Sequence, residues 1–105
     1  MEKPDNPIIG KWQQPEGQPY AGLWFEFNPD GTFQAVYSEM GVTSSGTFIV
    51  SGDLLYLDQT QHSFGLIRKF EGRFRIDSAS LLMSLGNPGE KAPVDLSKAR
   101  LYLKQ

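Results

Sequence analysis

The chain contains no cysteine, which excludes disulfide bonds, thiolate metal sites and cysteine nucleophiles. It contains a single histidine, His62, and no cluster of histidine and acidic residues at metal-ligand spacing. No stretch approaches the roughly 18 apolar residues of a membrane span, so we expect a soluble protein. Ten basic side chains balance twelve acidic ones, and this small net charge of -2 gives no electrostatic drive toward nucleic acid. We expect no metal, no cofactor and no nucleic-acid partner.

A length of 105 residues suits one compact core. Residues 1–7 lack apolar side chains beyond the first methionine and predict a flexible leader, followed by a single domain over residues 8–105. The compartment stays open. The chain reads as cytoplasmic as written, and as periplasmic or cell-surface if a leader has been removed.

Short runs of alternating apolar and polar residues dominate the sequence, separated by Gly, Pro, Asn, Asp and Ser. This pattern is typical of antiparallel strands joined by tight turns, and helical periodicity is nearly absent. Eight strands are predicted, over residues 8–14, 22–28, 31–39, 44–51, 53–60, 64–77, 80–86 and 99–104.

Eight strands joined by short turns predict an up-and-down meander that closes into an all-β, antiparallel barrel, because closure removes exposed strand edges. The longest connection, residues 87–98, is expected to be a surface loop or a lid. An alternative for residues 95–103 is a short helix with Asp95 as its N-cap.

Strand parity predicts which side chains point into the barrel. The interior would be mainly aromatic, and the residues expected to line a ligand site are Phe25, Phe27, Phe33, Tyr37, Phe70 and Phe74. The same parity points Arg68 inward, where a guanidinium needs a carboxylate, water or an anionic ligand. Two other readings stay open for Arg68: a bulge near Gly65 or Gly72 that reverses parity, or a place at the strand end from which the side chain reaches solvent.

Gly10-Lys11-Trp12 opens the first strand and matches the G-x-W signature of the lipocalins. Two further turn-strand motifs, Phe27 to Thr32 (FNPDGT) and Gly46-Thr47-Phe48, resemble those of small bacterial lipocalin-like (calycin) domains. The resemblance covers nearly the whole chain. It implies a barrel closed at one end by Trp12 packed against Arg100 of the last strand, and open to a small apolar ligand at the other end. The chain departs from the family in its short length and in having no helix after the eighth strand, so the aromatic side chains could fill a narrow barrel.

Arg100-Leu101-Tyr102 also resembles the R-x-Y carboxylate clamp of intracellular fatty-acid-binding proteins. The expected parity of the last strand argues against this role. If Leu101 and Leu103 face the core, Arg100 and Tyr102 face solvent.

Two functions are therefore weighed. The first is a carrier or sensor that binds a small apolar or amphipathic molecule. The second is a filled barrel that acts as a protein-interaction module, such as a protease-inhibitor-like protein, through segments 1–7 and 13–20. Outward-facing Trp24 and Ile67 leave a homodimer open.

No acid-base or nucleophile constellation converges in the sequence, so we do not expect an enzyme. His62 is read as a turn residue, and Lys69, Arg73 and Arg75 as a solvated strand face.

Overall fold

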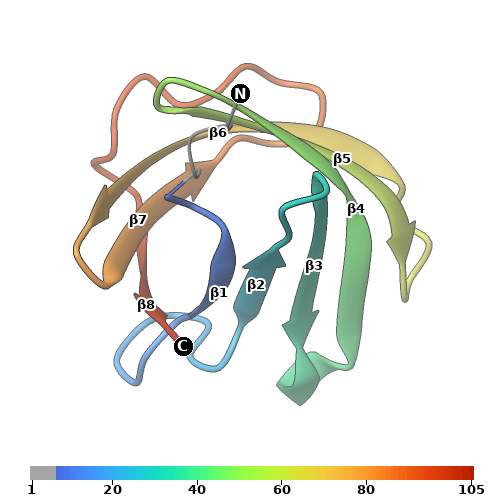
Figure 1. Cartoon of the computed structure of the whole chain (residues 1–105). Helices are drawn as coiled ribbons and strands as arrows, with labels where there is room; N and C mark the ends of the chain where they lie inside the picture. Colours follow the sequence, from blue (N-terminus) through green and yellow to red (C-terminus); the bar gives the residue numbers. More distant parts are fainter. Residues whose placement is uncertain (1–6) are drawn as a thin grey trace.

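The computed structural model describes residues 7–105, which form a closed antiparallel barrel of eight strands (Figure 1). Each strand pairs with its neighbours in sequence, and β8 pairs with β1. The strands are β1 (Gly10–Gln13), β2 (Trp24–Phe27), β3 (Thr32–Tyr37), β4 (Val42–Ser51), β5 (Leu54–His62), β6 (Arg68–Asp77), β7 (Ser80–Leu85) and β8 (Arg100–Lys104). The only helical element of residues 7–105 is a 3-10 turn, η1 (Ser38–Met40). The predicted fold class is confirmed.

The chain segments assigned to strands agree with the alternation pattern, and the differences lie at their ends. β6 begins at Arg68 rather than at residue 64, and β5 extends to His62. The helix alternative for residues 95–103 is wrong, because residues 100–104 are a strand. Asp95 instead accepts a hydrogen bond from the Ser97 amide at 3.0 Å in a local turn.

A meander places alternate connections at opposite ends of the barrel. We call the end with the β2–β3, β4–β5 and β6–β7 turns the closed end. The open end carries the β1–β2, β3–β4, β5–β6 and β7–β8 connections, residues 14–23, 38–41, 63–67 and 86–99. The β7–β8 connection first runs beside β6, where Gly86 and Gly89 donate amide hydrogen bonds to the Glu71 and Lys69 carbonyls (Figure 1).

Tight packing of β4 on β5 explains the glycine in the Gly46-Thr47-Phe48 motif. The strand register shifts between Ser45 and Gly46, which is a β-bulge. A side chain at Gly46 would overlap the Asp58 carbonyl oxygen on β5. Only glycine allows this close approach of the two backbones.

The core fills the closed half of the barrel with aromatic side chains. Phe27 lies edge-on to Phe48 with ring centroids 5.0 Å apart, and parallel to Phe25 at 5.8 Å. The buried apolar side chains are Ile8, Trp12, Phe25, Phe27, Phe33, Ala35, Phe48, Leu55, Leu57, Phe74, Leu81, Met83 and Tyr102. The inward parity predicted for β2, β3 and β5 is thus present.

Candidate functional site

Trp12 closes one end of the barrel interior, and its partner is a lysine. The Trp12 indole nitrogen donates to the Ile8 carbonyl at 2.9 Å. The Lys104 Nζ lies 4.7 Å from the centre of the indole ring and donates to the Ile9 carbonyl at 3.0 Å. Gly10 makes room for this side chain, because a Cβ there would lie 2.7 Å from Nζ. The glycine and the tryptophan of the G-x-W motif therefore both contribute to the contact with Lys104.

The expected pairing of Trp12 with Arg100 is wrong, because Arg100 lies toward the opposite end of β8. The strand register places Trp12 opposite Lys104, and Arg100 opposite Met83. Four residues of extended strand separate Arg100 from Lys104 by about 13 Å. Lys104 therefore has the position that the resemblance gave to Arg100.

The parity expected for β8 is also reversed in the structure. Tyr102 is 4% exposed, and its ring lies edge-on to Phe25 with centroids 5.8 Å apart. Leu103, expected in the core, is 39% exposed. Alternation misled here because both faces of this five-residue strand carry apolar side chains, so hydrophobicity alone does not choose between them. The parity argument against an inward Arg100 and Tyr102 therefore fails.

A pocket of about 650 Å³ lies at the open end, between the barrel interior and the β7–β8 connection. Leu23, Phe25 and Met83 supply apolar walls. Gln14, which follows β1, and Arg100 and Tyr102 of β8 supply polar groups from both ends of the chain. The β7–β8 connection adds polar and charged residues to the outer wall of the pocket, namely Asn87, Glu90, Lys91, Asp95, Ser97 and Lys98. Apolar walls with polar anchoring groups are typical of small-molecule sites.

Gln14 is the most unusual side chain of the pocket, because it is 1% exposed and only one of its two polar atoms forms a hydrogen bond. Its Oε1 accepts a hydrogen bond from the Tyr20 amide at 3.1 Å. Its Nε2 has no hydrogen-bond partner within residues 7–105. The Gln14 amide lies near enough to the Tyr102 phenol to lower the pKa of Tyr102, but it forms no hydrogen bond with it, so an acceptor placed in the pocket would give Nε2 a partner.

Tyr102 and Arg100 add further donors. Burial raises the pKa of Tyr102 to about 12, while the nearby Gln14 amide and the Arg100 charge act in the opposite direction. The phenol therefore stays protonated at neutral pH and can donate. Arg100 is half-buried and forms no ion pair or side-chain hydrogen bond within residues 7–105. Three cationic side chains line the pocket (Lys91, Lys98 and Arg100) and outnumber its two carboxylates (Glu90 and Asp95). Together with the donors of Gln14 and Tyr102, this excess of positive charge favours an anionic group.

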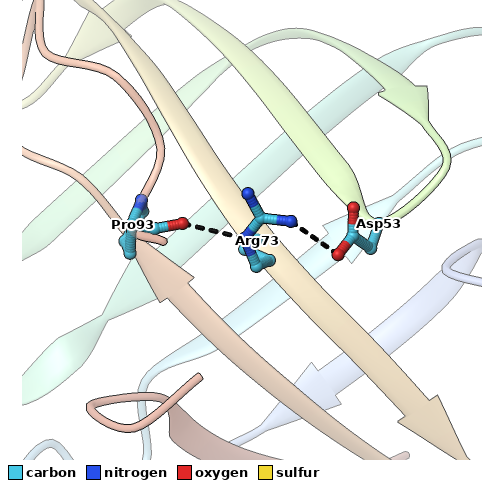
Figure 2. Close-up of polar contacts among 3 residues, drawn as sticks. All are labelled: Asp53, Arg73 and Pro93. Atoms are coloured by element: carbon cyan, nitrogen blue, oxygen red, sulfur yellow. Dashed lines mark hydrogen bonds and ion pairs between the residues drawn. The ribbon is translucent and has the colours of Figure 1, made fainter. Parts of the chain in front are cut away.

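An arginine on the outer face of β6 holds one wall of this pocket in place. The Arg73 Nε donates to the Pro93 carbonyl at 2.8 Å, and its Nη1 pairs with the Asp53 carboxylate at 2.6 Å (Figure 2). Pro93 lines the pocket, whereas Asp53 lies in the β4–β5 turn. Arg73 is thus a tether between two connections rather than part of a solvated face.

Arg68 does not reach the barrel interior, so the expectation of an inward guanidinium is wrong. Its backbone pairs with Gln59, whose side chain is buried, and its position is therefore on the inner face. Arg68 is the first residue of β6, however, and its side chain is exposed at the barrel rim. This is the strand-end geometry that the sequence left open.

The aromatic residues expected to line a ligand site divide between the pocket and the core. Phe25 lines the pocket. Phe27, Phe33 and Phe74 are buried in the core cluster, and half-buried Phe70 packs against it. Tyr37 lies at the rim, edge-on to Tyr20 at 5.9 Å. Most of the predicted lining therefore fills the barrel.

Sequence reasoning missed Gln14, although a signal for it was present. Trp12 was expected inside, and parity then places Gln14 on the same face. The inward direction of Tyr102 follows from its pairing with buried Leu81 on β7, and the sequence does not reveal this pairing. The predicted interaction segment 13–20 is partly anchored, because the Gln18 Oε1 accepts from the Leu101 amide at 2.9 Å. Of segment 1–7, residues 1–6 lie outside the described residues.

Within residues 7–105 no group of three or more His, Cys, Asp or Glu side chains is placed to hold a metal ion. His62 ends β5, and its Nδ1 accepts a hydrogen bond from the Phe64 amide at 3.0 Å. Over the same residues, no helix is long and apolar enough to cross a membrane. Comparison with family models, with curated proteins and with solved structures yields no significant match.

Proposed function

We propose that this protein is a lipocalin-like binding protein rather than an enzyme, and that its ligand is a small amphipathic molecule with an acidic head. The buried, unpartnered Nε2 of Gln14 carries the proposal, since it lines the same pocket as Arg100 and Tyr102. A volume of about 650 Å³ lies within the ordinary range of ligand pockets.

The polar groups define the head of this ligand. Arg100 can present two parallel donors, and Tyr102 and Gln14 one each. A carboxylate or phosphate accepts such a set, and the charge-assisted bonds to the guanidinium would be the strongest. The apolar part of the ligand would lie against Leu23, Phe25 and Met83.

The length of the apolar part is restricted by the core. Phe27 and Phe33 fill the space beneath the pocket, at 1% and 2% exposure. A ligand would therefore occupy the open end alone, which favours a compact or short-chain molecule over a long lipid chain inserted to the closed end.

Native mass spectrometry of the protein purified gently from cells that produce it tests this proposal. We expect an added mass that disappears on denaturation, and a loss of most of it in Arg100→Gln. Removing a charge-assisted hydrogen bond costs about 1.5–3 kcal/mol, which corresponds to an affinity reduced by roughly tenfold to a hundredfold. Arg75→Gln changes an exposed arginine on the outer face of β6 and serves as the matched control.

A bare mass in the wild type, or equal retention by Arg100→Gln, would contradict the proposal. In that event the second function, a protein-interaction module, is favoured, because aromatic side chains fill the closed half of the barrel. Segment 13–20 would then be the first surface to test by pull-down, because Glu16 and Pro19 are exposed there.

A further inference from the structure

The exposed apolar side chains of this protein gather at the open end. Eight large apolar side chains are exposed within residues 7–105, and six of them lie in the four open-end connections: Tyr20, Met40, Phe64, Leu66, Ile67 and Val94. The other two, Ile49 and Leu103, lie on strands of the barrel wall. Scattered single apolar residues are normal on a protein surface, but concentration on one set of loop tips is not.

The β5–β6 connection contributes three of these side chains within four residues. Phe64 is 69% exposed, Leu66 41% and Ile67 50%. Met40 of the neighbouring β3–β4 connection is 62% exposed. We call these four side chains the apolar rim.

Hydrogen bonds hold the two connections of the apolar rim together. The Ser63 Oγ donates to the Gly41 carbonyl at 3.0 Å and accepts from the Thr43 amide at 3.1 Å. The buried Gln59 side chain donates to the Leu66 carbonyl at 2.6 Å from inside the barrel. The Gly65 and Ile67 amides are also bonded within the turn. The apolar side chains are therefore presented by a loop whose backbone is already largely satisfied.

Two basic residues follow the apolar side chains directly. Residues 63–69 read SFGLIRK and contain Arg68 and Lys69 but no acidic residue, so this segment carries two positive charges. Both basic side chains are exposed, and neither forms an ion pair within residues 7–105. Acidic residues also lie beside the apolar rim, because Glu39 precedes Met40 and Asp58 is opposite Lys69 in the strand register. Arg68 is opposite the neutral Gln59, so it is the basic side chain of this segment with no carboxylate opposite it.

We propose that the open end docks on the surface of a bilayer that contains anionic phospholipids. Phe64, Leu66 and Ile67 enter the boundary between headgroups and acyl chains, and Arg68 and Lys69 meet the phosphates. A bilayer accepts separate protruding side chains without shape matching, whereas a protein partner needs a continuous complementary surface. The satisfied loop backbone lowers the cost of leaving bulk water.

Sedimentation with vesicles tests the proposal on the full chain without added ligand, so its outcome is independent of whether the pocket is occupied. We expect binding to vesicles of equal phosphatidylcholine and phosphatidylglycerol, and binding at least about tenfold weaker to phosphatidylcholine alone. Added salt should weaken the first interaction.

Paired variants separate the two contributions. Leu66→Asn with Ile67→Asn should weaken binding to the mixed vesicles about tenfold or more, whereas Ile49→Asn, which alters a still more exposed apolar residue on the barrel wall, should not. Arg68→Gln with Lys69→Gln should remove most of the preference for the anionic lipid, and Arg75→Gln should leave it unchanged.

The absence of native cysteine permits a direct measure of depth. A polarity-sensitive fluorophore on Phe64→Cys should shift to shorter wavelength when mixed vesicles are added, and the same label on Ile49→Cys should not. No vesicle binding, equal loss in the Ile49→Asn control, or no spectral shift at position 64 would overturn the proposal. A solution dimer that Leu66→Asn with Ile67→Asn dissociates would also overturn it, because the apolar rim would then join two copies of the chain.

Discussion

Polar side chains inside an apolar barrel lower its stability unless they find partners. Gln14 and Tyr102 are buried and Arg100 is half-buried in the same pocket, and only one of the two polar atoms of Gln14 has a hydrogen bond. Such local departures from ideal packing occur most often at functional sites. The unpartnered amide of Gln14 is therefore the reason for placing the proposed ligand in the pocket at the open end.

Tyr102 should make the protein sensitive to alkaline pH. The unfolded chain releases the phenol proton near pH 10, whereas the folded protein holds it to about pH 12. The folded state binds more protons than the unfolded chain between these two pH values. The free energy of unfolding therefore falls as the pH rises from about 10 to about 12, and this contribution is fully present below pH 10. We expect Tyr102→Phe to remove roughly 2 kcal/mol of this fall in urea denaturation curves.

Tyr20→Phe, which alters an exposed tyrosine, is the control for the alkaline titration. The same steep fall in Tyr102→Phe as in the wild type would show that other groups cause it. The pocket's other residues are unchanged by either substitution.

Inward-facing residues were predictable where a strand has one clearly apolar face. The inward positions of β2 and β3 are all apolar, and Phe25, Phe27 and Phe33 are buried as parity requires. In β8 a tyrosine and two leucines occupy opposite faces, and only the pairing with β7 decides between them. The exposure of Arg68 depends on where β6 begins, which a pattern in sequence locates poorly.

At the scale of elements, the β7–β8 connection decides the shape of the pocket. Its composition predicted a surface loop but not its path, which depends on contacts with residues distant in sequence. The Arg73 bond to Pro93 joins positions 20 residues apart, and Arg73 also reaches Asp53 in another turn. Alternation within strands carries no information about such tethers.

Arg73→Ala should loosen this connection without altering the barrel. We expect backbone amides of residues 90–98 to exchange several-fold faster with solvent, while the amides of β4 and β5 keep their protection. The free energy of unfolding should fall by about 1 kcal/mol or less, because the ion pair is partly exposed. Hydrogen exchange measured by mass spectrometry resolves the two regions.

Arg75→Ala, on the same outer face of β6, is the matched control. Unchanged exchange of residues 90–98 in Arg73→Ala would mean that the connection is held by its other bonds, such as Gly86 to Glu71.

For the whole molecule, closure of the barrel depends on a short seam. β1 and β8 share two paired positions, Trp12 with Lys104 and Gln13 with Leu103. The Gln105 amide adds a bond to the Lys11 carbonyl at 2.9 Å. The strand count and turn chemistry predicted a closed barrel, but the seam's reliance on Lys104 was not predictable, because the residue likeness pointed to Arg100.

Lys104→Met should weaken the seam. The variant keeps the apolar stem but loses the cation over the Trp12 ring and the bond to the Ile9 carbonyl. We expect the urea midpoint to fall by an amount equivalent to about 1 kcal/mol. Lys98→Met, which changes an exposed lysine outside the seam, should leave the midpoint nearly unchanged.

The pocket shares its residues with that seam. Gln14 follows β1, Arg100 and Tyr102 belong to β8, and the Gln18 to Leu101 bond joins positions 83 residues apart. Contacts of such long sequence separation are the slowest to form in folding. The pocket is therefore complete only when β1 and β8 have paired. A ligand that contacts residues from both ends of the chain would slow the separation of these two strands.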